Sequence, residues 1–331
     1  MNEPLPTPIT FVSGLEVGHF TDPRRPTGCT VVIARDGAVA GVDVRGAAPG
    51  TRETDLLAPT NLVERVHGIV LAGGSAWGLD AATGVVRWLE EHGIGMPVGP
   101  ARLPIVPGAV LFDLLVGDSA IRPDAEAGYR ACQAASSLAP AEGNVGAGAG
   151  AVVGKIFGIG RAMKGGIGCA SVTVDGVTVV ALIACNALGD VIDHDTGQPI
   201  AGARSTDGKR LLDSRRALLA GEAPQPLIAG TNTTIGVIAT DALITKVQAT
   251  RLAQMGHDGL ARSINPVHTM SDGDTLFALG TGASGKRLGM MTLGAMAAEV
   301  SARAVVRAVR AAQGIEVAGL KLPSMADLSR G

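Results

Sequence analysis

The residues with the greatest chemical potential are Asn232, Thr233 and Thr234, which stand where a polar stretch becomes a strongly strand-forming run. Threonine favours strands, so a threonine pair at a strand edge is usually structural. A second interpretation is chemical. If the bond between Asn232 and Thr233 were broken, Thr233 would gain a free α-amino group with a pKa of about 7.7–8.0. That amine could accept the proton of the hydroxyl group on the same residue, so one threonine would supply both nucleophile and base.

Two carboxylates, Asp272 and Asp274, flank a glycine just before a predicted strand over 275–279. They either belong to an ordinary Asp-Gly turn or, if both point the same way, orient a protonated amine or shift the pKa of a nearby nucleophile. His268 precedes them and could be a base, a ligand or a simply hydrogen-bonded side chain. The sequence leaves these alternatives open.

Three further stretches resemble known sites but lack the required context. Residues 146–151 fit Gly-x-Gly-x-x-Ala, yet no strand precedes them and no amphipathic helix follows, so we expect no nucleotide there. Ser75 resembles a nucleophile elbow, but Trp77 replaces the second glycine, and a helix cap is the favoured interpretation. Residues 193–195 (Asp-His-Asp) have the residue types of metal ligands. Three consecutive loop residues cannot easily surround one ion, so we expect a solvated turn.

Composition excludes several classes of protein. The 331 residues include 28 Lys and Arg and 30 Asp and Glu, a net charge of −2, so we expect no nucleic acid or membrane as partner. The four cysteines have no Cys-x-x-Cys spacing and are expected to be reduced, mostly buried thiols. The start of the chain lacks a secretory pattern, and no apolar stretch approaches about 20 residues. We therefore expect a cytoplasmic protein without a metal or cofactor.

Strand-like and helix-like segments alternate along the chain, and several connections look like hairpins. This pattern favours helices layered over a mixed sheet rather than a purely parallel, doubly wound sheet. Residues 35–37 are predicted to turn a hairpin, and residues 190–230 to form an exposed connector. The expected strands are 30–34, 38–44, 69–72, 109–115, 169–174, 178–185, 233–240 and 275–279, and the expected helices are 75–92, 123–135, 243–263 and 288–312.

Four stretches, taken together and in this order, resemble one known family. They are residues 68–79 (GIVLAGGSAWGL), 143–150 (GNVGAGAG), 231–241 (TNTTIGVIATD) and 259–278 (GLARSINPVHTMSDGDTLFA). The chain is similar over residues 14–312 to the L-aminopeptidase D-esterase/amidase (DmpA) family, which includes β-peptidyl aminopeptidases and nylon-oligomer hydrolases. The resemblance implies an α/β (α+β) protein of one catalytic domain, built as an αββα sandwich with mixed sheets between helical layers.

The same resemblance implies that the chain cuts itself into an α chain (1–232) and a β chain (233–331), with Thr233 as the new N-terminus and nucleophile. Asn186 matches the family's oxyanion-hole asparagine, and Lys155 matches a lysine near the nucleophile in the nylon-oligomer branch. Asp272 and Asp274 match the acidic pair of that branch.

The implied substrate pocket includes Gly74, Ser75 and Trp77. Trp77 stands where the family has a tyrosine, and its indole N–H donates from a different place and fills more space.

The function that we expect is hydrolysis of small amides, peptides or amide oligomers through an acyl-enzyme on Thr233. A second hypothesis is acyl transfer of the ornithine acetyltransferase type, which uses the same self-cut threonine. A third is a binding or scaffold protein in which residues 232–233 are only a strand edge. The family also implies a homo-oligomer, a tetramer of αβ units.

Overall fold

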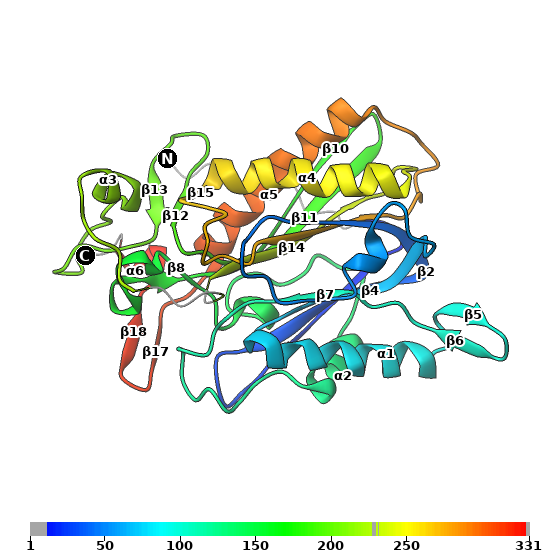
Figure 1. The fold of residues 1–331 in the computed structure, drawn as a ribbon, viewed down its shortest axis with the longest axis horizontal. Helices are drawn as coiled ribbons and strands as arrows, with labels where there is room; N and C mark the ends of the chain where they lie inside the picture. The colour runs from blue at the N-terminus through cyan, green and yellow to red at the C-terminus, as the bar shows by residue number, and fades with distance from the viewer. Residues whose placement is uncertain (1–11, 227–229, 231, 329–331) are drawn as a thin grey trace.

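The computed structural model describes residues 12–226, 230 and 232–328, and these residues form four stacked layers (Figure 1). Helices α4 and α5 cover one side of a folded sheet, and α1 and α2 cover the other side. The fold is therefore an αββα sandwich. The bounds of these helices are α1 (Ala81–Glu91), α2 (Ala125–Gln133), α4 (Lys246–Ser263) and α5 (Met290–Ala311).

The sheet has nine strands in the order β10-β11-β14-β16-β2-β4-β7-β3, with β1 paired to β2. The β14–β16 and β4–β7 pairs are parallel and the other pairs are antiparallel, so the sheet is mixed. The strands are β1 (Glu16–Thr21), β2 (Gly28–Val44), β3 (Thr51–Arg52), β4 (Arg65–Ala72), β7 (Gly108–Val110), β10 (Gly166–Val174), β11 (Val177–Asn186), β14 (Thr233–Thr240) and β16 (Thr275–Gly280).

Strand β2 joins the two halves of the sheet. Its first part pairs with β1 and β4, and its last part pairs with β16. The predicted hairpin at residues 35–37 is wrong, because these residues lie inside one continuous strand. They form an irregularity in the pairing with β4, between Ile33 and Ala38. The Asp-Gly pair is thus used for a bulge, which bends a strand without ending it.

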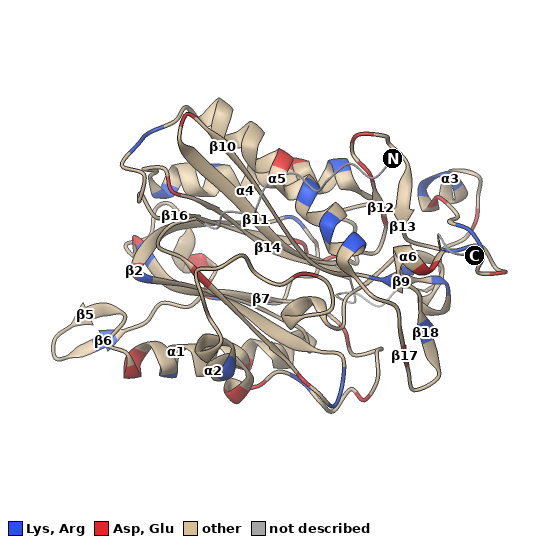
Figure 2. Cartoon of the chain, turned by 180° about the vertical axis from the view of Figure 1, so that it is seen from behind, with Lys and Arg blue, Asp and Glu red and all other residues tan. Residues whose placement is uncertain are grey.

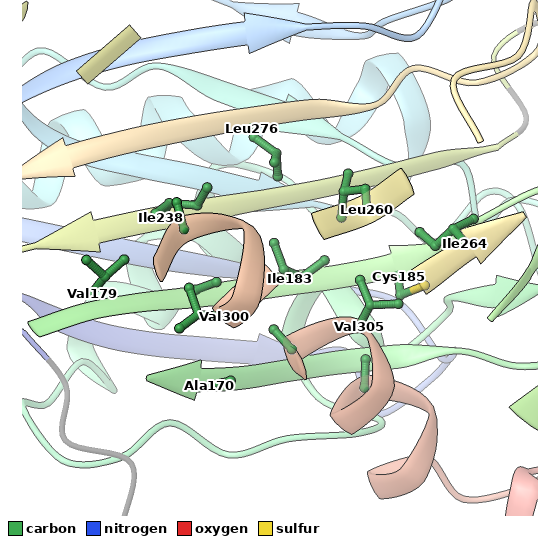
Figure 3. Packing of buried hydrophobic residues seen from close by; sticks show 14 of the residues in the cluster. Ala170, Val179, Ile183, Cys185, Ile238, Leu260, Ile264, Leu276, Val300 and Val305 are labelled. Carbon is green, nitrogen blue, oxygen red and sulfur yellow. The ribbon is translucent and has the colours of Figure 1, made fainter. Parts of the chain in front are cut away.

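Three layers of apolar side chains hold the sandwich together. One lies between helices α4 and α5 and the half of the sheet that contains β10, β11 and β14. Ile183, Ile238, Leu260 and Val300 pack together there (Figure 3). A second fills the space between the two halves of the sheet, and a third packs under α1 and α2. Burial of these side chains is the main force that fixes the layers.

Glycine allows α5 to lie close to the sheet. A Cβ atom on Gly168 of β10 would lie 2.2 Å from the carbonyl oxygen of Ala304, and one on Gly259 of α4 would lie 2.2 Å from that of Ala298. No side chain fits at either position. Close backbone approach is therefore one reason why the chain contains 47 glycines.

The predicted helix 75–92 is two elements. Residues Ser75–Asp80 form a 3₁₀ helix, and α1 begins at Ala81. Ser75 has φ of 54° and its side chain caps no helix, so the predicted cap is wrong. The predicted strand 109–115 is also shorter, since β7 ends at Val110. By contrast, α4 starts at a complete capping box formed by Thr245 and Gln248.

The described part of the predicted connector 190–230 is folded. It contains β12 (Asp190–Ile192), β13 (Pro199–Ala201) and α3 (Ser214–Leu219). Asp190 is buried and accepts hydrogen bonds from the backbone N–H groups of Ala203 and Ser214 and from the Ser214 hydroxyl. This carboxylate ties together segments that looked like an open loop. Residues 227–229 of the connector lie outside the described residues.

The remaining elements are short. They are β5 (Met96–Val98), β6 (Ala101–Leu103), β8 (Val152–Val153), β9 (Met163–Lys164), β15 (Ile264–Asn265), β17 (Ile315–Val317), β18 (Leu320–Leu322), α6 (Met325–Leu328) and 3₁₀ helices at Asp55–Leu57, Gly146–Gly148, Lys155–Phe157 and Ile159–Arg161. Across the described ranges, no helix combines the length and apolar character that crossing a membrane requires.

Charged side chains lie mainly on the helices and the connecting loops (Figure 2). Strands β11, β14 and β16, in the middle of one half of the sheet, carry none. Carboxylates and amines near the start of β14 must therefore come from other segments of the chain.

Candidate active site

Thr233 is the first residue of β14 and is almost fully buried. Its hydroxyl donates a hydrogen bond of 2.5 Å to the carbonyl oxygen of Asn232. The N–H of Gly273 donates to the same oxygen at 2.9 Å. The carbonyl oxygen between Asn232 and Thr233 thus has two donors, the Thr233 hydroxyl and the Gly273 N–H. The N–H donor is placed where it could stabilise an oxyanion formed at this carbonyl.

The loop 268–274 holds the chain on both sides of this peptide bond. Asn232 forms a parallel bridge with Asp272, and the N–H of Thr234 donates to Oδ1 of Asp274 at 2.7 Å. The structure therefore brings the predicted carboxylate pair, Asp272 and Asp274, next to the predicted threonine, Thr233. A Cβ atom on Gly273 would lie 2.7 Å from the carbonyl oxygen of Ala48 and 3.0 Å from Oγ1 of Thr233. Only glycine fits between the two carboxylates.

Asn186, the last residue of β11, lies directly opposite Thr233 in the antiparallel pair β11–β14. Two donors point at its Oδ1, the N–H of Val152 and the ammonium of Lys155, both at 2.9 Å. These donors require an oxygen, so they fix the orientation of the amide. Its Nδ2 donates to the carbonyl oxygen of Phe112 at 3.1 Å. Among the described residues, no acceptor is recorded for the second N–H of Nδ2.

Lys155 is buried beside Asn186 and also donates to its backbone carbonyl oxygen at 2.8 Å. Burial lowers the pKa of Lys155 from 10.5 to about 7, against the opposing effect of Asp272, the buried thiol of Cys185, and Asp274. A substantial fraction of this amine is therefore neutral near pH 7 and able to accept a proton.

The two carboxylates differ in their environments. Burial, and then the neighbouring Asp274, raise the pKa of Asp272 to about 6. Its Oδ2 accepts hydrogen bonds from the N–H and the hydroxyl of Thr269, at 2.8 and 2.6 Å. Asp274 instead accepts from three N–H groups, those of Thr234 and His268 and the ring Nδ1 of His268. The raised pKa brings Asp272 close to the pH at which a carboxyl group can exchange a proton.

The predicted pocket residues lie partly apart from this cluster. Gly74 donates its N–H to Oδ1 of Asp113 at 2.9 Å, next to Phe112, which holds Asn186. Trp77 is 55% exposed and carries the guanidinium of Arg122 4.3 Å above its ring. It lines a cavity of about 540 Å³ with Ala76, Asp80, Ala120, Arg122, Pro123 and Asp124. Within the described part of the chain, no recorded hydrogen bond or ring contact joins Trp77 to Thr233.

Sequence reasoning missed Lys164 and Asp113. Lys164 is fully buried, and its ammonium donates to the carbonyl oxygens of Gly148, Ala151 and Gly165 at 2.8–3.0 Å. It therefore anchors the glycine-rich segment that brings Val152 to Asn186. The available clue was its position among apolar and glycine residues, which indicates burial. A buried lysine needs hydrogen-bond acceptors for its ammonium group.

Asp113 is buried as well. It forms an ion pair with Arg25, accepts from the Thr27 hydroxyl at 2.6 Å and holds Gly74. Nothing in the local sequence distinguishes this aspartate from a surface one.

The other candidate motifs lie elsewhere. Residues 146–148 form a short 3₁₀ helix and open no longer helix. The solvated turn predicted at residues 193–195 is wrong for His194, whose side chain is 6% exposed and lies 3.6 Å from Glu299. In the described ranges, no three His, Cys, Asp or Glu side chains are grouped so that they could hold a metal ion. All four cysteines are free and buried, as predicted.

Comparison with solved structures defines the fold class. A beta-aminopeptidase of Burkholderia sp. superposes with a TM-score of 0.72 at 24% identity, covering 99% of this chain and 95% of the other. The L-aminopeptidase D-Ala-esterase/amidase of Ochrobactrum anthropi, described as a variant of the Ntn-hydrolase fold, superposes with a TM-score of 0.73 at 19% identity, covering 100% of this chain and 94% of the other. These likenesses confirm the predicted fold.

The family follows from the sequence. Residues 7–321 match Peptidase family S58, and the chain belongs to this family. An uncharacterized aminopeptidase of Mycobacterium leprae is 46% identical over 338 residues, covering 93% of this chain and 91% of the relative. A 6-aminohexanoate-oligomer endohydrolase of Kocuria sp. is 32% identical over 311 residues, covering 90% of this chain and 84% of the relative. The predicted resemblance is confirmed, and the protein is a hydrolase of amide or peptide bonds.

Proposed function

We propose that this S58 hydrolase activates itself by cleaving the bond between Asn232 and Thr233, and that Thr233 is then its nucleophile. One observation carries the proposal. The Thr233 hydroxyl lies 2.5 Å from the carbonyl oxygen of the bond to be cut, and the N–H of Gly273 donates to the same oxygen.

Self-cleavage would begin when Oγ of Thr233 attacks the carbonyl carbon of Asn232 and gives up its proton. The oxygen of Asn232 becomes an oxyanion, which accepts a hydrogen bond from Gly273. The C–N bond then breaks and the nitrogen takes up a proton, which leaves an ester on Thr233 and a free amine. Water hydrolyses the ester. No α-amine exists before this cut, so Lys155, with its pKa of about 7, or Asp272, with its pKa of about 6, would accept the first proton.

In the processed enzyme the α-amine of Thr233 would act as base for its own hydroxyl. The second N–H of the Asn186 amide would donate to the oxyanion formed from the substrate. An amide substrate would thus be cleaved through an acyl-enzyme ester, and water would release the acyl group. We propose short peptides and amide oligomers, such as 6-aminohexanoate oligomers, as substrates, because the Kocuria relative bears that name. The acyl-transfer hypothesis receives no support from the relatives named above.

Intact-mass measurement of the purified protein tests this proposal with a matched pair of variants. The wild-type protein should give two fragments, the smaller beginning at Thr233. Thr233→Val keeps the β-branched shape but removes the hydroxyl, and it should stay uncut and inactive. Thr234→Val removes the neighbouring hydroxyl and should be cut and active. An active wild-type protein that remains one chain would overturn the proposal, as would an active Thr233→Val variant.

A further inference from the structure

His268 has a backbone conformation that is uncommon for residues other than glycine. Its φ is 54°, in the left-handed region, where a non-glycine residue is strained. Such strain persists where surrounding contacts hold the residue in place, and it concentrates at functional sites. The contacts here are two hydrogen bonds to Oδ2 of Asp274, one from the backbone N–H at 3.2 Å and one from the ring Nδ1 at 2.8 Å.

Because both of these contacts are made to Oδ2, the other carboxylate oxygen of Asp274 can accept a hydrogen bond from β14. Oδ1 of Asp274 accepts the N–H of Thr234 at 2.7 Å, immediately after Thr233. Rotation of the Asp274 side chain would break this hydrogen bond at the start of β14. His268 donates to Oδ2 from two directions and so opposes that rotation.

We propose that His268 is a positioning residue, which locks Asp274 so that the Thr233–Thr234 segment keeps its reactive geometry. The inference rests on the proposed role of Thr233. No hydrogen bond joins the described side chains of His268 and Thr233, so His268 acts through Asp274.

A second histidine packs against the ring of His268. His257 of α4 lies edge-on to it, with ring centroids 4.9 Å apart and an interplanar angle of 68°. Nε2 of His257 lies 3.0 Å from the carbonyl oxygen of Asp43, and burial lowers the pKa of His257 to about 4. A neutral ring at this position gives packing without adding a charge beside the carboxylates.

The arrangement also decides between the roles that the sequence left open for His268. A carboxylate oxygen only accepts hydrogen bonds, so Nδ1 carries the proton in the bond to Asp274. Nε2 is buried and has no hydrogen-bond partner among the described residues. One ring nitrogen is committed to Asp274, and no hydrogen bond among the described residues joins the other to Thr233, which favours positioning over proton transfer.

Two variants with the same backbone tolerance separate positioning from general structural support. Asparagine and glycine both accept a positive φ, but only asparagine offers a side-chain N–H donor to Asp274. His268→Gly should lower kcat by about 10²-fold with little change in KM, because a small displacement of reacting groups costs that much. His268→Asn should recover most of the loss. Equal losses in both variants, or no loss in His268→Gly, would overturn the proposal.

A measurement on the unaltered enzyme covers the case in which His268→Gly does not fold. Nitrogen NMR of protein with ¹⁵N-labelled histidine rings should show His268 protonated on Nδ1, with a resonance that shifts in Asp274→Asn. A proton on Nε2 alone would overturn the proposal. This result does not depend on the nucleophile. If Thr233→Val proved active while His268 carried its proton on Nδ1, the proposed function would fail and the lock on Asp274 would stand.

Discussion

Asn186 and Thr233 are direct partners across the antiparallel strands β11 and β14. Side chains at directly opposite positions have Cβ atoms about 4.5–5.5 Å apart. The sheet therefore places a hydrogen-bond-donating amide beside the Thr233 hydroxyl. Both strands are buried along their length, so this relationship belongs to the rigid core of the molecule rather than to a loop.

Asn186→Asp tests the role of the amide donor. Aspartate has nearly the same shape but cannot donate from Nδ2, so the oxyanion loses one hydrogen bond. We expect kcat of the processed enzyme to fall by about 10²–10³-fold, the usual cost of removing such a donor, with KM changed much less. Steady-state kinetics on protein shown by mass to be cut would measure this.

The half-buried residue Asn144 provides the control. Asn144→Asp makes the same chemical change at a side chain that contacts Gln313, and it should leave kcat as it was. If Asn186→Asp kept full activity, the amide would not be an oxyanion donor.

Lys155→Arg tests the base for self-cleavage. Arginine remains charged at all working pH values, whereas the pKa of Lys155 is lowered to about 7. We expect the unprocessed wild-type chain to be cut faster as the pH rises from about 6 to 8, since the neutral amine then accumulates. Lys155→Arg should be cut at least about 10²-fold more slowly, within the usual range for loss of a general base. Time-resolved intact mass after refolding at each pH would follow the cut.

The matched control for this experiment is Lys209→Arg, at an exposed lysine. It should process like the wild-type chain. If Lys155→Arg were cut at the normal rate and with the normal pH profile, another group would accept the Thr233 hydroxyl proton. Asp272 would then be the next residue to substitute.

Buried lysines should shape the pH dependence of stability. The folded pKa values of Lys155 and Lys164 are lowered by burial from 10.5 to about 7. Between these values the unfolded chain binds more protons, so the free energy of unfolding should rise with pH from about 7. Above pH 9 the buried thiols act in the opposite direction, because burial raises the pKa of Cys185 to about 12. The rise should therefore be clearest between pH 7 and 9.

Lys164→Met isolates the contribution of one lysine. The variant leaves three backbone carbonyl oxygens without their donor and should be less stable overall. Its free energy of unfolding should also rise less steeply between pH 7 and 9, and urea denaturation across this range would give both values. An unchanged slope would mean that Lys164 stays protonated in the folded protein.

Local patterns in the sequence were enough to identify most individual elements. The run that begins at Thr233 is a strand because it is rich in β-branched residues, and the strands expected at 169–174 and 178–185 lie in β10 and β11. Short-range preferences failed where tertiary contacts outweighed them. Examples are the bulge inside β2, the 3₁₀ segment that begins at Ser75 and the folded segment around Asp190.

The sequence by itself determined which side chains are present to do chemistry, and motif resemblance named Thr233, Asn186, Lys155 and the Asp272/Asp274 pair. Only the tertiary structure decided how they act together. The orientation of the Asn186 amide depends on Lys155 and Val152, and the shifted pKa values of Lys155 and Asp272 depend on burial. Hydrogen-bond direction and desolvation are set by groups distant in the chain, which no local pattern contains. For the same reason the contacts of Lys164 and Asp113, and those between His268 and Asp274, became visible only in the folded chain.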